Sequence, residues 1–308
     1  MTQDLASGRQ LLEQAAQSLL DPQGRAVAAA VQWWTLPGLA GSWPVAVLGP
    51  QPGTPAPAAA PPEPVLLLHG FDSSCLEFRR VAPLLAAQRT VLIPDLYGFG
   101  FAPRPADGDY APAGVLRHLQ ALVELACERL QVPRLGLIGA SMGGSVAVEL
   151  ARRCPQRISR LLLLAPAGLT GRPMPLPPLL DGLGVRFLAL PGVRRGLCRS
   201  AFADPEASVG PAELEIASLH LATPGWAMAL ARFARSGGFA GCGTPLPQQP
   251  LQVLWGMNDR ILRPPQKRAA QALLGERLRE LDHCGHLPHL DQPAAVVQAW
   301  SDLCLLPL

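Results

Sequence analysis

The organisation of this chain is decided by residues 135–144, LGLIGASMGG. The apolar run Leu135–Ile138 predicts a buried strand, and the residues after Ser141 have the pattern of a helix over about 142–153. The pentapeptide between them matches G-x-S-x-G, in which a serine stands on a sharp turn from strand to helix with its hydroxyl exposed. Glycines flank it because side chains there would collide with the neighbouring strand and helix. This context predicts a nucleophilic serine at position 141.

Apolar strand patterns and helical patterns alternate on both sides of this stretch. Strands are predicted at Val65–Leu68, Val91–Pro94, Leu135–Ile138, Arg160–Leu164, Leu251–Trp255 and Arg277–Leu281, and helices at about 75–87, 113–130, 142–153, 264–274 and 293–303. Such alternation implies right-handed crossovers, and therefore an α/β fold with a mostly parallel sheet covered by helices on both faces.

The alternation divides the chain into four segments. A helical leader, residues 1–30, precedes the first part of the core, residues 31–167, which opens with a pair of short strands within 31–48 and includes a flexible Pro/Ala-rich loop at 49–64. A helical lid, residues 168–249, is inserted before the next-to-last strand, with short helices around Leu183–Leu190, Pro211–Leu221 and Trp226–Ala234. Residues 250–308 complete the core. The lid should cover the carboxyl ends of the strands, where open α/β sheets bind ligands.

The leader carries an apolar stripe at helical spacing over residues 5–20, which predicts an amphipathic helix. Its polar face has mostly Gln rather than the Lys and Arg that are typical of a helix lying on a membrane surface. We therefore expect this stripe to pack on the core.

A serine hydroxyl needs a base within hydrogen-bonding reach, and the base needs a third group to hold it. Asp259 follows the predicted strand Leu251–Trp255 and is the candidate acid, with an Asx turn as the alternative and Asp282 and Asp291 as rivals. After the last strand, the sequence DHCGHLPH at 282–289 holds three histidines. His286 is the candidate base because the glycine before it frees the loop.

The other two histidines of this loop, His283 and His289, are expected to be packing or surface residues. With Cys284 the trio also suggests a metal site, but no second cluster is present to complete one, so no metal ligands are predicted. The backbone N–H groups of Phe71 and Met142 are the candidate oxyanion hole, since they follow an early strand and the nucleophile respectively. The segment Asp72-Ser73-Ser74 is expected to cap the helix that begins near Cys75.

Composition excludes several classes of function. The formal net charge is +3, and no basic cluster interleaved with aromatic residues is present, so no nucleic-acid partner is expected. The seven scattered cysteines lack a C-x-x-C pair and favour a reducing compartment. No secretory signal pattern and no apolar run near ~20 residues is found. We expect a cytoplasmic protein without an obligate protein partner, with peripheral membrane contact left open.

Taken together, these motifs resemble those of the α/β-hydrolase family from about residue 64 to the end. They are HGF at 69–71, D-x-x-G-x-G at 95–100, G-x-S-x-G at 139–143, an aspartate after a strand, and G-H-x-P at 285–288. More narrowly, LLLHGFDSSCLEFR at 66–79 resembles a segment of the chlorophyll dephytylases of photosynthetic organisms, which hydrolyse the phytyl ester of chlorophyll. The resemblance implies a serine hydrolase without a cofactor and a lipophilic carboxylic ester as substrate.

The apolar lid residues, among them Trp226 and Phe233, suit a lipophilic substrate, although a helical insertion also packs in this way. Within enzymes, the same fold also hosts hydrolysis of carbon–carbon bonds and cofactor-free peroxidation. An acidic carbon–carbon substrate would require an arginine in the pocket. Outside enzymes, the fold serves as a ligand-binding receptor or a scaffold.

Overall fold

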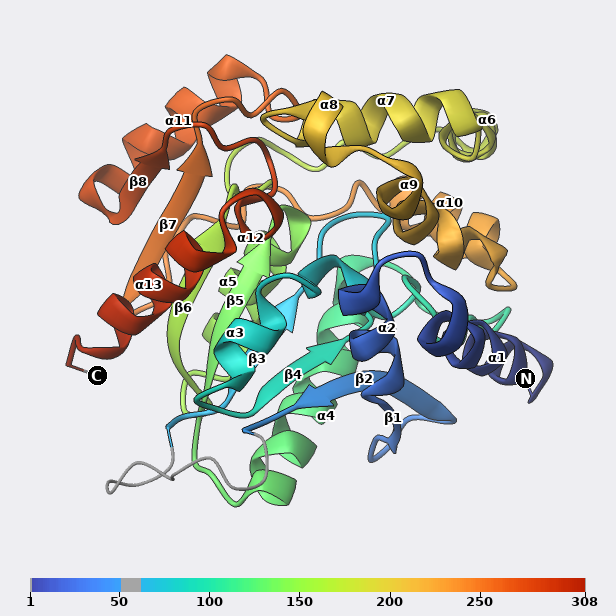
Figure 1. Ribbon diagram of the computed structural model, residues 1–308, viewed down its shortest axis with the longest axis horizontal. Coiled ribbons are helices and arrows are strands. Elements are labelled where there is room, and N and C mark those ends of the chain that lie inside the picture. Colours follow the sequence, from blue (N-terminus) through green and yellow to red (C-terminus); the bar gives the residue numbers. More distant parts are fainter. Residues whose placement is uncertain (1, 51–61, 308) are drawn as a thin grey trace.

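The computed structural model describes residues 2–50 and 62–307. Within these ranges the strands form one sheet in the order β1-β2-β4-β3-β5-β6-β7-β8 (Figure 1). The strands are β1 Val31–Thr35, β2 Ser42–Leu48, β3 Val65–Leu68, β4 Val91–Pro94, β5 Leu135–Ala140, β6 Ile158–Leu164, β7 Leu251–Gly256 and β8 Leu278–Leu281. The strands β3 to β8 pair in parallel, whereas β2 is antiparallel to both β1 and β4. The prediction of a mostly parallel sheet is confirmed.

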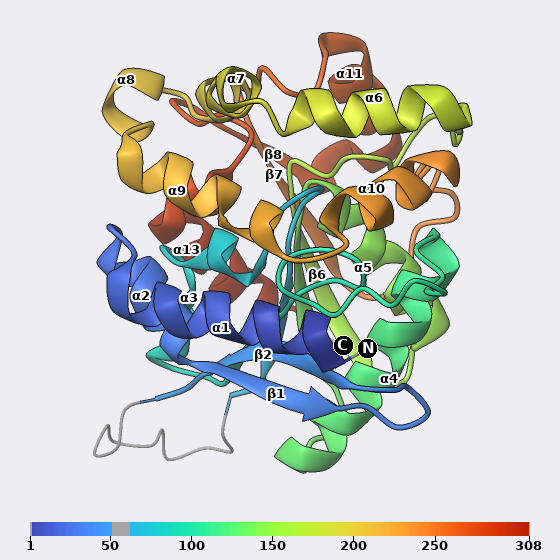
Figure 2. The same ribbon diagram turned by 90° about the vertical axis from the view of Figure 1, so that its right-hand side faces the viewer.

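Helices cover both faces of the sheet, as predicted (Figure 2). On one face lie α4 Pro112–Leu130, α5 Met142–Arg153 and α11 Pro264–Leu274, and on the other α1 Thr2–Ser18, α2 Pro22–Ala29, α3 Ala82–Ala86 and α13 Pro293–Cys304. Successive residues of β3 point to opposite faces, so Leu66 and Leu68 pack against α4 and α5, whereas Val65 and Leu67 join the core with α3 and α13.

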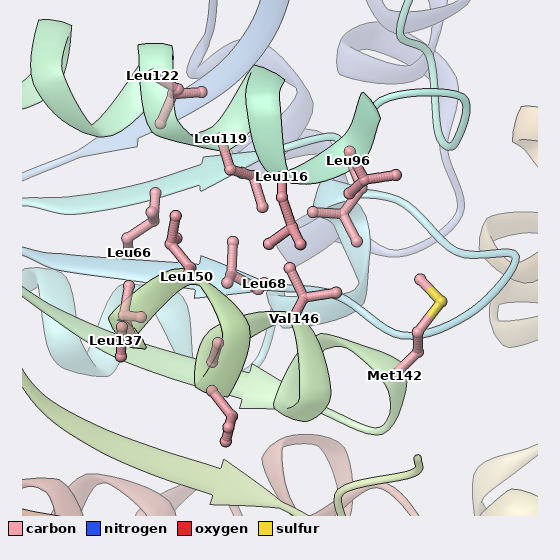
Figure 3. Packing of buried hydrophobic residues seen from close by; sticks show 14 of the residues in the cluster. Leu66, Leu68, Leu96, Leu116, Leu119, Leu122, Leu137, Met142, Val146 and Leu150 are labelled. Carbon is pink, nitrogen blue, oxygen red and sulfur yellow. The ribbon is translucent and has the colours of Figure 1, made fainter. Parts of the chain in front are cut away.

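The first of these cores is shown in Figure 3. Its side chains come from β3 and β5 on the sheet and from the facing stripes of α4 and α5: Leu66, Leu68, Leu137, Leu116, Leu119, Leu122, Val146 and Leu150. Because these leucines and valines are almost completely removed from solvent, the sheet and the helix that follows Ser141 form one rigid unit. This rigidity is what a precisely placed serine requires.

The lid lies between β6 and β7 over the carboxyl ends of the strands, as the topology in Figures 1 and 2 makes plain. Its helices are α6 Pro178–Leu188, α7 Pro191–Ala201, α8 Pro205–Ser208, α9 Pro211–Leu219 and α10 Trp226–Arg235, with the 3₁₀ turn η2 His220–Ala222. The prediction of one short helix at Leu183–Leu190 was incomplete. Pro191 begins a second helix there, because a proline at the first helical position costs no internal hydrogen bond.

The helix predicted at about 75–87 is in fact two pieces, the 3₁₀ turn η1 Cys75–Phe78 and the short helix α3. Pro83 lacks the N–H that a continuous helix would need at that position, so α3 has to begin anew around it. Of the segment 72–74 that was predicted to cap this helix, Ser74 occupies the cap position of η1, but its side chain makes no cap hydrogen bond.

In the leader, α1 covers most of the helix predicted over residues 5–20, and a second short helix, α2, follows because Asp21 caps it and Pro22 begins it. The apolar stripe of α1 is buried against the protein at Leu12, Ala15 and Leu19, whereas Leu20 remains exposed. The stripe therefore packs on the core, as expected. Most of the predicted loop at 49–64 lies outside the described residues.

Candidate active site

Ser141 stands on the turn between β5 and α5 with φ +51° and ψ −120°, a backbone conformation that L residues seldom adopt. The flanking glycines make the turn possible. A Cβ on Gly143 would lie 2.0 Å from the carbonyl oxygen of Leu68, and one on Gly139 would lie 2.3 Å from the carbonyl oxygen of Gly143. The Ser141 N–H donates to Leu164 O at 2.9 Å and ties the turn to β6.

The structure brings Ser141, His286 and Asp259 together from three distant parts of the chain. His286 Nε2 lies 2.9 Å from Ser141 Oγ, and His286 Nδ1 lies 2.9 Å from Asp259 Oδ2. In this geometry Nδ1–H donates to the carboxylate, so Nε2 is free to accept the serine proton. The arrangement can therefore turn a weak hydroxyl nucleophile into a reactive one.

Every neighbour of the Asp259 carboxylate is a hydrogen-bond donor. Oδ2 accepts from Trp255 Nε1 at 3.0 Å in addition to His286, and Oδ1 accepts from the N–H groups of Ile261 at 2.8 Å and Leu262 at 3.1 Å. Burial raises the pKa of Asp259, but the hydrogen bond and charge of His286 and the two backbone N–H groups outweigh it, so this pKa lies below its usual value. The carboxyl is held as an ion that faces His286.

The loop of residues 69–72 runs beside the serine. A Cβ on Gly70 would lie 3.3 Å from Ser141 Cβ, so only a glycine allows this approach without adjustment. His69 is buried and holds the loop, because its Nε2 accepts from Leu96 N at 3.0 Å and its Nδ1 donates to Gly70 O at 2.8 Å. Phe71 follows directly and lines the adjoining cavity, while Met142 is the first residue of α5, where an N–H has no intrahelical acceptor.

The remaining histidines of the loop after β8 have other positions. His283 is exposed and has a positive φ, whereas His289 is buried against the ring of Phe78, with 4.8 Å between the ring centres. His289 Nε2 also lies 3.2 Å from Glu77 Oε1. The rival acid Asp291 supports the loop, since its Oδ2 accepts from Gly285 N at 2.6 Å.

Glu77 belongs to the candidate site by its position, and the sequence analysis missed it. Its carboxylate accepts from the Gly70 N–H at 3.2 Å and lines the cavity next to Ser141. Burial raises its pKa, but the hydrogen bond and charge of His289 and the charge of His69 outweigh burial and lower the pKa to about 2. Glu77 therefore carries a buried negative charge that fixes the loop beside the serine.

Asp72 connects that loop to the lid. Its carboxylate accepts from Trp226 Nε1 at 2.8 Å and from His220 Nε2 at 3.1 Å, and it pairs with Arg194 at 2.5 Å. These partners belong to α10, η2 and α7 respectively. Burial raises the Asp72 pKa, yet His220, Arg194 and Trp226 together lower it. Within the segment 72–74, Asp72 is therefore not a helix-capping side chain, because its carboxylate is occupied by groups more than 100 residues away in sequence.

A cavity of about 240 Å³ opens beside Ser141 and His286. Apolar lid residues form much of its wall, including Leu188, Leu197 and Phe202. Trp226 and Phe233, predicted to contact substrate, do not line it. Trp226 is instead bonded to Asp72, and Phe233 packs in an aromatic group with Phe71, Phe99 and Phe239 that attaches the lid to the core. The contact of these two residues with substrate therefore stays a prediction, and the structure gives both of them a role in attaching the lid to the core.

Two arginines, Arg79 and Arg194, also line the cavity, but each is already paired. Arg194 is bound to Asp72, and Arg79 to Glu213 and to Asp21, the latter at 2.7 Å. In the described part of the chain, no group of three or more His, Cys, Asp and Glu side chains is arranged to hold a metal ion. Over the same residues, no helix combines the length and apolar character needed to cross a bilayer. The cysteines are free thiols.

Comparison with known proteins places the chain among its relatives. Residues 65–299 match the family model described as "Alpha/beta hydrolase family". The chain belongs to this family. A protein of Arabidopsis thaliana named "Alpha/beta hydrolase domain-containing protein VTE7" is 33% identical over 250 residues, which cover 78% of this chain and 73% of that protein.

Other members of the family match less of the chain or at lower identity. A 2-hydroxymuconate semialdehyde hydrolase of Pseudomonas is 34% identical over 110 residues, covering 35% of this chain and 38% of that protein. Among solved structures, a putative lipase of Acinetobacter baumannii has a TM-score of 0.72 at 22% identity and covers 96% of this chain and 95% of its own. At that identity the structural likeness establishes the fold alone.

Proposed function

We propose that this alpha/beta hydrolase is a serine esterase that works through an acyl-enzyme on a lipophilic carboxylic ester. The observation that carries the proposal is the continuous hydrogen-bonded line from Ser141 Oγ through His286 to Asp259, with both distances at 2.9 Å. The fold brings these groups together across the chain, since 145 residues separate Ser141 from His286 and 27 separate His286 from Asp259. It is the arrangement that activates a serine nucleophile.

The reaction follows from these positions. Ser141 Oγ attacks the ester carbonyl carbon while its proton passes to His286 Nε2, and the charge that develops on the carbonyl oxygen is stabilised by the N–H groups of Phe71 and Met142. His286 then gives the proton to the departing alcohol, which leaves an acyl group on Ser141. A water molecule, deprotonated by His286, hydrolyses this acyl-enzyme and restores the serine. The chemistry needs no cofactor.

The cavity favours an uncharged, apolar substrate. Its lid-side wall is largely aliphatic and aromatic, and ligand sites of this kind usually hold a lipophilic group against one or two polar contacts. Its volume of about 240 Å³ is below the ~300–1,000 Å³ typical of ligand pockets, so a long chain such as phytyl would extend through the lid-side mouth. The resemblance of residues 66–79 to chlorophyll dephytylases makes chlorophyll the specific substrate to test.

Hydrolysis of a carbon–carbon bond in an acidic diketone is the rival reaction, and the Pseudomonas relatives carry names of that type. Such a substrate needs an unpaired cation near its carboxylate. The cavity arginines Arg79 and Arg194 are neutralised by Asp21, Glu213 and Asp72 instead. The pocket therefore favours the ester, and cofactor-free peroxidation has no specific support here.

Two experiments test the proposal. A fluorophosphonate probe should label the protein at Ser141 and should fail to label the Ser141→Ala variant, with Ser145→Ala as a labelling control. Ser145 is a suitable control because it lies in the same helix but donates to Ala167 O, away from His286. Absence of labelling in the folded wild type would favour a ligand-binding receptor over an esterase. Incubation with chlorophyll a, compared with a simple aliphatic ester, then tests the substrate through the release of chlorophyllide.

A further inference from the structure

Half of the twelve large apolar side chains that are exposed in the described part of the chain lie in the first part of the lid. Large side chains exposed by 40–80% gather between residues 174 and 197: Met174, Leu176, Leu183, Phe187, Leu190 and Leu197. We call these six residues the lid patch. Three of them lie in α6 and α7, the helices that Figures 1 and 2 show in the layer beyond the carboxyl ends of the strands.

The helix α6 is apolar on two sides, which is unusual for a helix at a protein surface. Val185 and Leu188 face the protein, whereas Leu183 and Phe187, one turn apart, face outward and are about 60% exposed. A helix that is apolar all round belongs in a core or against an apolar medium. The exposed apolar side chains on the outward side of α6 therefore indicate a binding surface for an apolar partner.

The charges around the lid patch indicate what that partner is. Residues 171–197 contain four arginines and a single acidic residue, and the rest of the chain holds 22 basic and 22 acidic residues, so the whole formal charge of +3 arises in this segment. Arg172, Arg186 and Arg195 are exposed and make no ion pair or hydrogen bond with any residue that the structure describes. The acidic residue, Asp181, is buried and bound to Arg235.

The lid patch is also continuous with the candidate active site. Leu197 is 40% exposed as a member of the patch and at the same time lines the cavity beside Ser141. Leu188 of α6 lines that cavity as well. A lipophilic molecule that lies against the patch is therefore next to the mouth of the cavity.

We propose that the lid patch docks this protein peripherally on an anionic lipid bilayer. Exposed leucine and phenylalanine side chains insert into the acyl boundary, and the unpaired arginines lie at the level of the anionic headgroups, the division of roles found in interfacial helices. The docking places the cavity mouth at the bilayer surface. It does not depend on the esterase activity proposed above, because binding can be measured without turnover.

The experiment uses full-length protein carrying Ser141→Ala, so that hydrolysis cannot affect the result. Flotation with vesicles of phosphatidylcholine and phosphatidylglycerol is compared with vesicles of phosphatidylcholine alone. We expect stronger partitioning into the anionic vesicles and weaker partitioning as salt screens the charges. Changing Arg172, Arg186 and Arg195 together to Gln should lower partitioning about fivefold for each arginine, on the order of 100-fold in all.

A matched control removes the same charge elsewhere. Arg134, Arg153 and Arg279 are exposed and lie outside the lid, so their joint replacement by Gln gives an identical net charge. This control should bind the vesicles as the parent does. Separately, Leu183→Ser with Phe187→Ser should lower partitioning into both kinds of vesicle by at least about tenfold. Circular dichroism and thermal unfolding verify that each variant is folded.

Three results would overturn the proposal. One is wild-type partitioning by the lid arginine variant, and another is an equal loss in the control variant. The third is a folded protein that ignores anionic vesicles but forms a concentration-dependent dimer abolished by Leu183→Ser with Phe187→Ser, which would make the lid patch an interface between two copies of this chain. If the leucine and phenylalanine variant fails to fold, the two arginine variants still decide between these outcomes.

Discussion

Replacing Asp259 by Asn is the sharpest single test of the candidate triad, because all four partners of this carboxylate donate hydrogen bonds. An asparagine offers one oxygen and one NH₂ group in their place. If the oxygen remains with Ile261 and Leu262, the NH₂ faces His286 Nδ1. The imidazole then has to accept there and carries its proton on Nε2, so it can no longer take the proton of Ser141.

The opposite orientation of the amide is unfavourable. With the oxygen toward His286, the NH₂ would face the N–H groups of Ile261 and Leu262 and leave all of these donors unsatisfied. The first orientation is therefore favoured, and turnover should fall about 10⁴-fold, as is typical when a triad histidine is held in the wrong tautomer. That factor corresponds to about 5.5 kcal/mol of transition-state stabilisation.

The measurement is kcat on a soluble chromogenic ester, together with the rate of fluorophosphonate labelling of Ser141. Trp255→Phe is the control, because it removes one donor to the same carboxylate but leaves the histidine tautomer alone, and its effect should stay within about tenfold. Thermal unfolding verifies that both variants are folded. Near-normal turnover by Asp259→Asn would refute the assignment of the acid and the tautomer argument with it.

Three further predictions concern stability. Asp72→Asn leaves Arg194 without its counter-charge in a buried position, so the free energy of unfolding should fall by about 3 kcal/mol in denaturant titration. Glu206→Gln breaks an exposed pair with Arg199 and should leave the free energy of unfolding almost unchanged. Equal losses for the two variants would contradict the role of Asp72. The pKa of Glu77, about 2, lies below the value near 4.5 that it has in the unfolded chain. The ionised carboxylate therefore contributes about 3 kcal/mol to the free energy of unfolding above pH 4.5, and this contribution is lost as the pH falls toward 2. The difference in stability between wild type and Glu77→Gln should close over that pH range, and a difference that does not change with pH would count against the role of Glu77. Gly143→Ala should lower the free energy of unfolding by about 3 kcal/mol or more, because the added Cβ collides with the carbonyl oxygen of Leu68. Gly192→Ala is the control and should be tolerated, because the space around Gly192 is open. Similar stabilities for the two variants would show that the turn at Ser141 is not close-packed.

Much of the fold could be predicted from the sequence, because it rests on short-range rules. The alternation of buried strands and amphipathic helices indicated the parallel sheet, and the glycines around Ser141 indicated the turn from strand to helix. Both depend on sterics and side-chain periodicity within a few residues. In the helix predicted at about 75–87, the periodicity was followed past Pro83, and one helix was expected in place of two.

The candidate site was only partly accessible in this way. His283, His286 and His289 lie within seven residues, so their spacing alone could not decide which of them is the base. The structure distinguishes them, because His286 contacts Ser141 and Asp259 whereas His289 is buried beside Glu77. The hydrogen bond between Asp72 and Trp226 was not foreseen, because 154 residues separate them along the chain.

What the sequence by itself determined, then, is the class of fold, the serine turn and the set of residues from which a triad could be drawn. Only the tertiary structure decided which loop residues meet, which arginines are neutralised and which lid side chains face solvent. The physical reason is that hydrogen bonds and ion pairs act over a few ångströms of space, while the groups that form them here are separated by 27 to 154 residues of chain. Patterns within a few residues of sequence therefore do not indicate which distant groups come into contact in the folded chain.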